Sequence, residues 1–431
     1  MYSRSIATRN TTVAALAAGA CAVTMTVAGL GAAPAANATC ASFFGLGNGG
    51  GCTSSPLSAA IAIGDGATAN AGGLFGAAFA LGTNSTAATS DAFTFATAVG
   101  NESSATAGGL FGIATRLGNN GSAITQGLAS FGNIGLNIAF GVSPASAGDS
   151  VVASGIGNLA ANLFGGATTP GAHAVTALGT LDIALNVGGV DNTVESGNGL
   201  FNRSINLFGN NNTVRGDGGL SNVGRNLFGN NNIVTTGGGD GNMATSLIGN
   251  NNQVTAVSGL LSIATSLLGD SNTVGVIGGT LNGTRNWFGS NNTVIAAGGA
   301  QNGSVNIGGN NNTLTALGTN GNAATNLFGS NSILTGGDPS SVNTAALTFA
   351  GNGNEVTGKG VNSVGFAVLG TLNNVKAGSG PFAFAGSVAQ NSANVEQTGT
   401  GVSVNSFRFG GGAAASKPAR TPAAAARGRA Q

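Results

Sequence analysis

The feature that most constrains this 431-residue chain is a twenty-residue repeat between residues 185 and 334. Glycine stands five residues before the hydrophobic residue that closes each unit, and asparagine, or serine in the last unit, stands two before it. A fixed period of this length predicts stacked repeats in place of a globular domain. The closing residues keep the spacing without a break: Val194, Val214, Val234, Val254, Val274, Val294, Leu314 and Leu334.

Within a unit, the residue types favour β-strands. In the unit that begins at Gly199, asparagine or a small residue recurs at every second position, at Asn202, Ser204 and Asn206, which fits the period of a strand. The several glycines, asparagines and β-branched residues of each unit disfavour a helix. We therefore predict an all-β fold, a parallel β-solenoid (β-helix or β-roll) of about 18 coils with repeats of about 18 to 24 residues.

The even offsets are assigned to the interior, and two roles are open for their asparagines. Stacked coils would place asparagines of one offset above one another, so that their amides pair from coil to coil. Alternatively, asparagine only supplies tight turns at the Gly-Asn-Asn-Asn corner. The odd offset at Ile205 and Arg225 mixes charged with β-branched residues, as a solvent-facing position does.

Two adjacent apolar rows do not fit this alternation. A row that we call the Leu/Trp row lies directly before a second row that contains Phe208 and Phe228, and the even offset predicts the Phe row to face inward. Either the chain bends and buries both rows, or one row forms an exposed stripe that marks a partner surface or a homo-oligomer contact. The Leu/Trp row consists of Leu207, Leu227, Leu247, Leu267, Trp287, Ile307 and Leu327.

Residues 1–38 have the pattern of a secretory signal peptide. Arg4 and Arg9 precede an apolar run from Val13 to Leu30, and Ala36-Asn37-Ala38 fits a cleavage site. An uncleaved membrane anchor is the alternative. Cleavage predicts a secreted or cell-surface protein of the cell envelope, with no integral membrane span in the mature chain.

The mature chain would keep two cysteines, Cys40 and Cys52, in a glycine-rich stretch. In an exported protein this pair predicts a disulfide that closes an N-terminal cap loop over residues 39–57. The other boundaries follow changes of period and composition. Residues 58–125 have an 18-residue period, which divides into three six-residue sides, residues 126–184 form irregular coils, and residues 335–409 continue the solenoid. Residues 410–431 form a disordered basic Ala/Pro tail.

Three segments of the 18-residue region resemble a known family. AIAIGDGATA (residues 60–69), FALGTNSTAA (79–88) and TAVGNESSATA (97–107) look like the head repeats of trimeric autotransporter adhesins. The resemblance implies a surface adhesion role and association of three chains. Taken whole, the signal peptide and the Ala-, Gly- and Asn-rich repeats also resemble exported repeat proteins of mycobacteria and their relatives.

The chemistry of the chain points away from catalysis. Charged residues make up 6% of it and are scattered, and His173, the sole histidine, lies in a predicted turn excursion. We expect no catalytic, cofactor or metal site, because a nucleophile relay or zinc site needs clustered partners. Asp240 resembles one calcium-binding nonapeptide position but does not recur. Nucleic-acid binding lacks a basic patch and stacking residues.

The leading hypothesis is a non-enzymatic exported β-solenoid that serves as a cell-surface or extracellular structural or adhesion module. A long polar face of repeated Asn, Thr and Ser would contact a glycan or a host or envelope surface protein through many weak interactions. One alternative is a polysaccharide-binding or polysaccharide-acting β-helix protein. The second is an ice-binding protein, based on a column of aligned threonines: Thr213, Thr273, Thr293 and Thr313.

Overall fold

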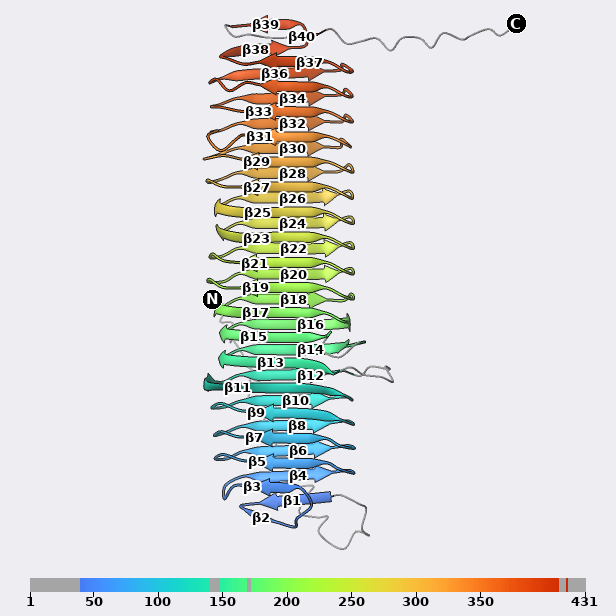
Figure 1. Cartoon of the computed structure of the whole chain (residues 1–431), viewed down its shortest axis with the longest axis vertical. Coiled ribbons are helices and arrows are strands. Elements are labelled where there is room, and N and C mark those ends of the chain that lie inside the picture. Colours follow the sequence, from blue (N-terminus) through green and yellow to red (C-terminus); the bar gives the residue numbers. More distant parts are fainter. Residues whose placement is uncertain (1–38, 140–147, 169–171, 411–415, 418–431) are drawn as a thin grey trace, which may run out of the picture.

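The computed structural model describes residues 39–139, 148–168, 172–410 and 416–417. These residues form a parallel β-solenoid of about 17 turns, which appears in Figure 1 as a straight stack of strands. The predicted fold class is therefore confirmed. The predicted signal peptide and most of the predicted basic tail lie outside the described residues. No helix in the described part of the chain is long and apolar enough to cross a membrane.

Each turn contributes one strand to each of two facing sheets, which we call sheet A and sheet B. Sheet A contains β1 (Thr39–Phe43), β2 (Leu46–Gly47), β4 (Ala59–Ile63), β6 (Ala77–Leu81), β8 (Phe95–Val99), β10 (Ile113–Leu117), β12 (Ile134–Ile138), β14 (Leu159–Gly166), β16 (Ile183–Val190), β18 (Arg203–Leu207), β20 (Val223–Phe228), β22 (Met243–Ile248), β24 (Ile263–Leu268), β26 (Gly283–Phe288), β28 (Gly303–Ile307), β30 (Ala323–Leu327), β32 (Ala345–Phe349), β34 (Val364–Val368), β36 (Ala383–Val388), β38 (Gly401–Val404) and β39 (Phe407–Phe409). Sheet B contains β3 (Cys52–Ser54), β5 (Thr68–Ala71), β7 (Thr86–Thr89), β9 (Ser103–Ala107), β11 (Gly121–Phe131), β13 (Asp149–Ile156), β15 (Ala174–Thr180), β17 (Thr193–Leu200), β19 (Thr213–Asp217), β21 (Ile233–Gly237), β23 (Gln253–Leu260), β25 (Thr273–Thr280), β27 (Thr293–Ala297), β29 (Thr313–Leu317), β31 (Ile333–Gly336), β33 (Glu355–Gly358), β35 (Asn374–Ala377), β37 (Asn394–Gln397) and β40 (Ser416–Lys417).

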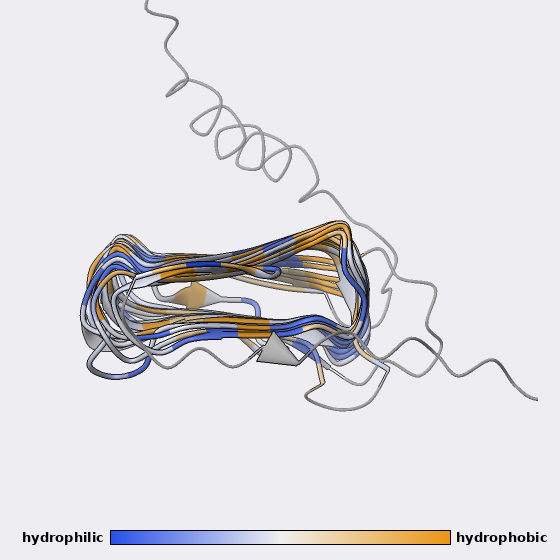
Figure 2. Cartoon of the chain, turned by 90° about the horizontal axis from the view of Figure 1, so that it is seen from above, coloured by the Kyte–Doolittle hydropathy of each residue, from blue (hydrophilic) through white to orange (hydrophobic). Residues whose placement is uncertain are grey.

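The register between turns follows the sequence repeat. Val214 pairs with Val194 on one side and Val234 on the other, so residues of one offset stack in a column along the rod. The 18-residue region keeps the same arrangement, because Ala78 pairs with Ala60 and Ala96. The expectation of three sides for these coils is wrong. Each coil has two strands joined by two corners, and Figure 2 shows the resulting flattened cross-section with two long sides.

The interior is filled by small and amide side chains, with one larger apolar column. On β18, Ser204 and Asn206 face inward, and on β19 Val214 does so. Alternate residues of each strand face outward, as the period of two predicts. The Val194–Leu334 column is fully buried, and alanines fill the interior of the first coils.

Antiparallel strands cover both ends of the solenoid. At the N-terminal end β1 pairs antiparallel with β4, and at the C-terminal end β39 pairs with β38 and β40 with β37. A disulfide joins Cys40 on β1 to Cys52 on β3 and so links sheet A to sheet B. The predicted disulfide is confirmed. Covering the terminal strands matters because an open sheet edge can pair with another chain.

Candidate functional site

The buried asparagines form two kinds of ladder. In the Asn206 column, the Nδ2 of each amide donates to the Oδ1 of the amide one turn earlier, as in Asn206 to Asn186 and Asn226 to Asn206, each at 2.7 Å. In the Asn212 column, the Oδ1 of Asn192 accepts the backbone N–H of Asn212 at 2.9 Å, and the Nδ2 of Asn212 donates to the carbonyl of Gly229 at 2.8 Å. These amides are satisfied inside the protein.

Both roles foreseen for asparagine occur, at different positions. The buried columns form the predicted ladders, whereas the exposed Asn211 has a φ of 55° and supplies the left-handed turn. The inward assignment of these asparagines is confirmed, so the outer polar face has to come from other residues.

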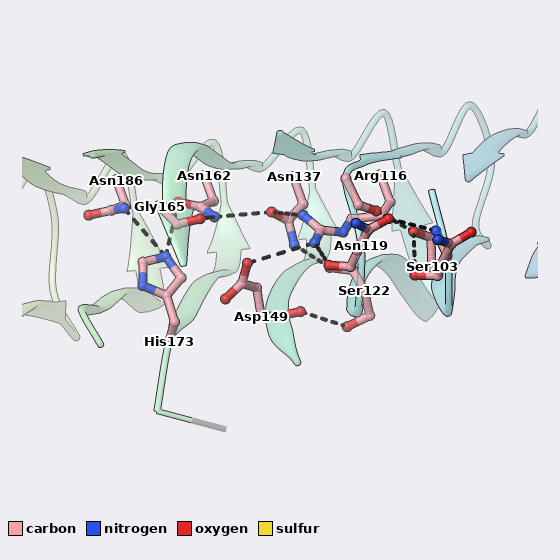
Figure 3. Close-up of polar contacts among 12 residues, drawn as sticks. Ser103, Arg116, Asn119, Ser122, Asn137, Asp149, Asn162, Gly165, His173 and Asn186 are labelled. Carbon is pink, nitrogen blue, oxygen red and sulfur yellow. Dashed lines mark hydrogen bonds and ion pairs between the residues drawn. The ribbon is translucent and has the colours of Figure 1, made fainter. Parts of the chain in front are cut away.

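A buried charged cluster closes the Asn206 column at its N-terminal end (Figure 3). The Nη1 of Arg116 donates to the Oδ1 of Asn137 at 2.9 Å, and its Nη2 lies 3.8 Å from the Oδ2 of Asp149. Asn162 donates to the same Asn137 oxygen at 3.0 Å. Burial raises the pKa of Asp149 to about 6 even though Arg116 lowers it, and burial also lowers the pKa of Arg116.

His173 precedes β15, outside any strand, yet its side chain belongs to the same interior. Its side chain is fully buried just before β15, where its Nδ1 accepts the backbone N–H of Asn192 at 3.1 Å. Its Nε2 therefore carries the proton and donates to the Oδ1 of Asn162 at 2.9 Å. Burial lowers the pKa of His173 to about 4, so the ring is neutral at pH 7. These contacts position His173 as a structural residue.

The described residues contain no group of three or more His, Cys, Asp or Glu side chains that could hold a metal ion. Two surface hollows are lined by polar groups. One of about 770 Å³ lies beside Asp91, Gln126 and Ser154, and one of about 330 Å³ lies beside Glu102 and Asp149. Neither hollow brings together a nucleophile, a base and an orienting group, which acyl-transfer chemistry requires.

The Leu/Trp row and the Phe row both lie outside the interior. The Leu/Trp row is partly exposed at the margin of the outer face of sheet A, and Trp287 is 40% exposed. Phe208 is 52% exposed and stacks on Phe228 with ring centroids 5.8 Å apart. Of the two alternatives for these rows, burial of both at a bend is excluded, and the inward assignment of the Phe row is wrong. At Phe208 a φ of 55° breaks the strand alternation and turns the side chain outward.

The outer face of sheet A is apolar well beyond this row. Each strand presents up to three outward side chains, such as Ile134, Leu136 and Ile138 on β12 or Ile183 and Leu185 on β16. The sequence-based prediction of an exposed stripe covered only the Leu/Trp row and did not include this face. The signal that could have found it is the recurrence of large apolar residues at odd offsets.

The outer face of sheet B is polar. Its first outward column contains the threonines considered for ice binding, and it extends through Thr68, Thr86 and Ser104 in the first coils. A second column, two residues further along each strand, also carries hydroxyls but is interrupted at Gly275 and Ile295. Its threonines are Thr235, Thr255, Thr315, Thr335 and Thr357.

Comparison with known proteins adds no family to this description. No protein-family model matches the chain, and no curated protein matches it in sequence. The function proposed below is therefore based on the outer faces of sheet A and sheet B.

Proposed function

We propose that this chain is a non-enzymatic, exported structural or adhesion module whose sheet B face binds an extended polymer, with a glycan as the first candidate. The observation that carries the proposal is the pair of columns on that face in which threonine and serine hydroxyls stack in register from turn to turn. The first column is interrupted at Ile233, Gln253 and Ile333. Successive residues of one column lie about 4.8 Å apart along the rod, so the face offers the same contact many times and weak individual contacts sum to useful avidity.

Export is supported by the pattern of residues 1–38 and by the Cys40–Cys52 disulfide, because such bonds persist in oxidising compartments. Resemblance of the first coils to adhesin head repeats, and of the whole chain to mycobacterial exported repeat proteins, supports a place at the cell surface. The absence of enzymatic activity is part of the proposal. It is supported by the enclosure of the His173 and Arg116 side chains within the core.

Cosedimentation of the purified chain with insoluble cellulose, chitin and peptidoglycan tests binding by this face. A triple variant, Thr235→Asp, Thr255→Asp and Thr315→Asp, places charges on sheet B. The matched control, Thr245→Asp, Thr265→Asp and Thr325→Asp, changes outward threonines of sheet A with similar exposure. We expect binding to at least one polymer that only the sheet B variant loses. Binding to none, or equal loss in both variants, would overturn the proposal. Assaying the same polymers for released sugars tests the non-enzymatic part.

Ice binding is a second candidate, because Thr313 and Thr315 stand side by side on the flat sheet B face. Thermal hysteresis of the purified chain measures it directly. Thermal hysteresis that the sheet B variant abolishes would favour ice over a glycan as the ligand. If the purified chain shows no thermal hysteresis, ice binding is excluded.

A further inference from the structure

The outer face of sheet A combines an apolar surface with a one-sided charge pattern. Every charged residue in the strands of sheet A is an arginine, and none is Asp or Glu. Arg203, Arg225 and Arg285 face outward from β18, β20 and β26. None of the three forms an ion pair within the described residues.

Sheet B shows the opposite pattern. Its outward cation Arg215 lies 3.3 Å from the carboxylate of Glu195. A second outward cation, Lys376, stands in register with Glu396 on the next strand. Further carboxylates, Asp217 and Glu355 among them, occupy the same face. The two faces are therefore built for different surroundings: the strands of sheet A present arginines among apolar side chains and no carboxylate, whereas sheet B carries charges of both signs.

The size of the face excludes an incidental patch. A strand of five residues is about 16 Å long, and about 17 turns at about 4.8 Å make the rod about 80 Å long. The product, about 1,300 Å², is the area of the whole face, including its arginines and threonines. The largest apolar patch of a typical soluble monomer covers about 300–600 Å². In-register columns also keep the face flat, so it fits a planar partner over its whole length.

We propose that this face lies on a lipid surface that carries anionic headgroups. Headgroup phosphates supply the negative charge that the face lacks, and arginine side chains can reach them while their neighbours contact acyl chains. Trp287, at the margin of the face, suits the boundary between headgroups and hydrocarbon. Sheet B would then point away from the membrane. The inference concerns a second surface and does not depend on the ligand of sheet B.

A second copy of the chain fits this face less well. Two sheet A faces packed together would bury arginines from both copies, and neither face carries a carboxylate to pair with them. Burying an unpaired charge is strongly unfavourable. Charge complementarity thus favours the lipid surface over a face-to-face dimer.

Flotation of the full chain with vesicles tests the proposal. Vesicles of phosphatidylcholine with 30% phosphatidylglycerol are compared with phosphatidylcholine alone. The variant Ile205→Glu with Ile263→Glu changes outward isoleucines of sheet A, and Ile295→Glu with Ile333→Glu is the matched control on sheet B. Residues 1–38 are unchanged throughout. A third variant, Arg203→Gln, Arg225→Gln and Arg285→Gln, removes charge without adding any.

We expect binding to the anionic vesicles that falls about tenfold or more in both sheet A variants and stays within about twofold in the sheet B control. Circular dichroism checks that each variant is folded, and the arginine variant keeps the test valid if glutamate prevents folding. Equal flotation of all the proteins, or of none, would overturn the proposal. The wild-type chain could also fail to float and form a dimer in light scattering. If only the sheet A variants then dissociated that dimer, the face would be assigned to a second copy of the chain.

Discussion

The Nδ2 of Asn206 donates to the Oδ1 of Asn186 one turn earlier at 2.7 Å, and both side chains are fully buried. This contact repeats along the interior and continues through Asn162 and Asn137 to Arg116. The solenoid therefore places its amides inside and many of its large apolar side chains outside. Its stability depends on satisfied hydrogen bonds as well as on the Val194–Leu334 column.

Asn226→Ala tests the ladder. The substitution leaves the Oδ1 of Asn206 without its donor and removes the acceptor that Asn232 contacts at 3.0 Å. We expect a loss of about 2–3 kcal/mol in the free energy of unfolding, measured by urea denaturation. Ser246→Ala, in the same column, is the control, because the Ser246 hydroxyl has no partner and its loss should change little. Equal effects of the two substitutions would contradict the ladder's role.

Asp182→Asn should stabilise the protein above about pH 6. Asp182 is fully buried in a column where neighbouring turns carry asparagine, and burial raises its pKa from 3.8 to about 6. Between these values the folded protein holds a proton that the unfolded chain has released, so wild-type stability falls as pH rises through this window. The variant carries no charge and should gain about 1–3 kcal/mol at pH 7.

The pH dependence of this gain identifies its cause. The difference between Asp182→Asn and the wild type should shrink as the pH falls from about 6 to 3.8, and it should be smallest below 3.8, where the Asp182 carboxyl is protonated in both states. Asp217→Asn, at an exposed position on sheet B, provides the comparison. A gain at Asp182 that is independent of pH would show that burial of the charge is not its source.

Gly229→Ala should be among the most damaging single changes. A Cβ at Gly229 would lie 1.9 Å from the carbonyl oxygen of Gly249 in the next turn, and its φ is 133°. The two neighbouring turns would have to move apart to make room for the methyl group. We expect this to lower the free energy of unfolding by about 3 kcal/mol or more. Gly283→Ala, where a Cβ meets no atom within 4 Å, should be neutral or slightly stabilising. Thermal unfolding followed by circular dichroism distinguishes the two.

Removing the disulfide should weaken one end of the rod. Cys52→Ser frees β3 from β1, and the lost constraint is worth about 3 kcal/mol for a loop of this size. Because each turn contacts only its neighbours, the effect should be local. Amide hydrogen exchange should accelerate in β4 and β5 and stay unchanged in β29 and β30. Uniform acceleration would contradict a local cap.

Much of the fold could be predicted from the twenty-residue period. The period fixes the stacking of Val194 on Val214 and of the asparagine columns, because equal spacing places equal offsets in register. The outward turn of Phe208 could not be predicted, since a positive φ at a non-glycine residue leaves no mark in the repeat. Nor could the two-sided cross-section, because an 18-residue coil divides equally well into three sides.

The buried charged cluster was hidden for a different reason. The cluster of Arg116, Asp149 and His173 lies where the coil lengths change. Arg116 donates to Asn137, 21 positions later, whereas Asn137 accepts from Asn162, 25 positions later. Without a constant period, sequence spacing does not show which side chains share a column. The apolar face of sheet A was within reach of the sequence, since its residues alternate with the buried ones.

Thiol accessibility tests most directly the claim that amides and valines fill the interior while large apolar residues lie outside. Single cysteines would replace Val254, Leu247 and Thr255 in a Cys21→Ser background, and their reaction with a maleimide would be timed. We expect the cysteines at positions 247 and 255 to react at least about tenfold faster than the one at position 254. Slow reaction at position 247 together with fast reaction at 254 would contradict it.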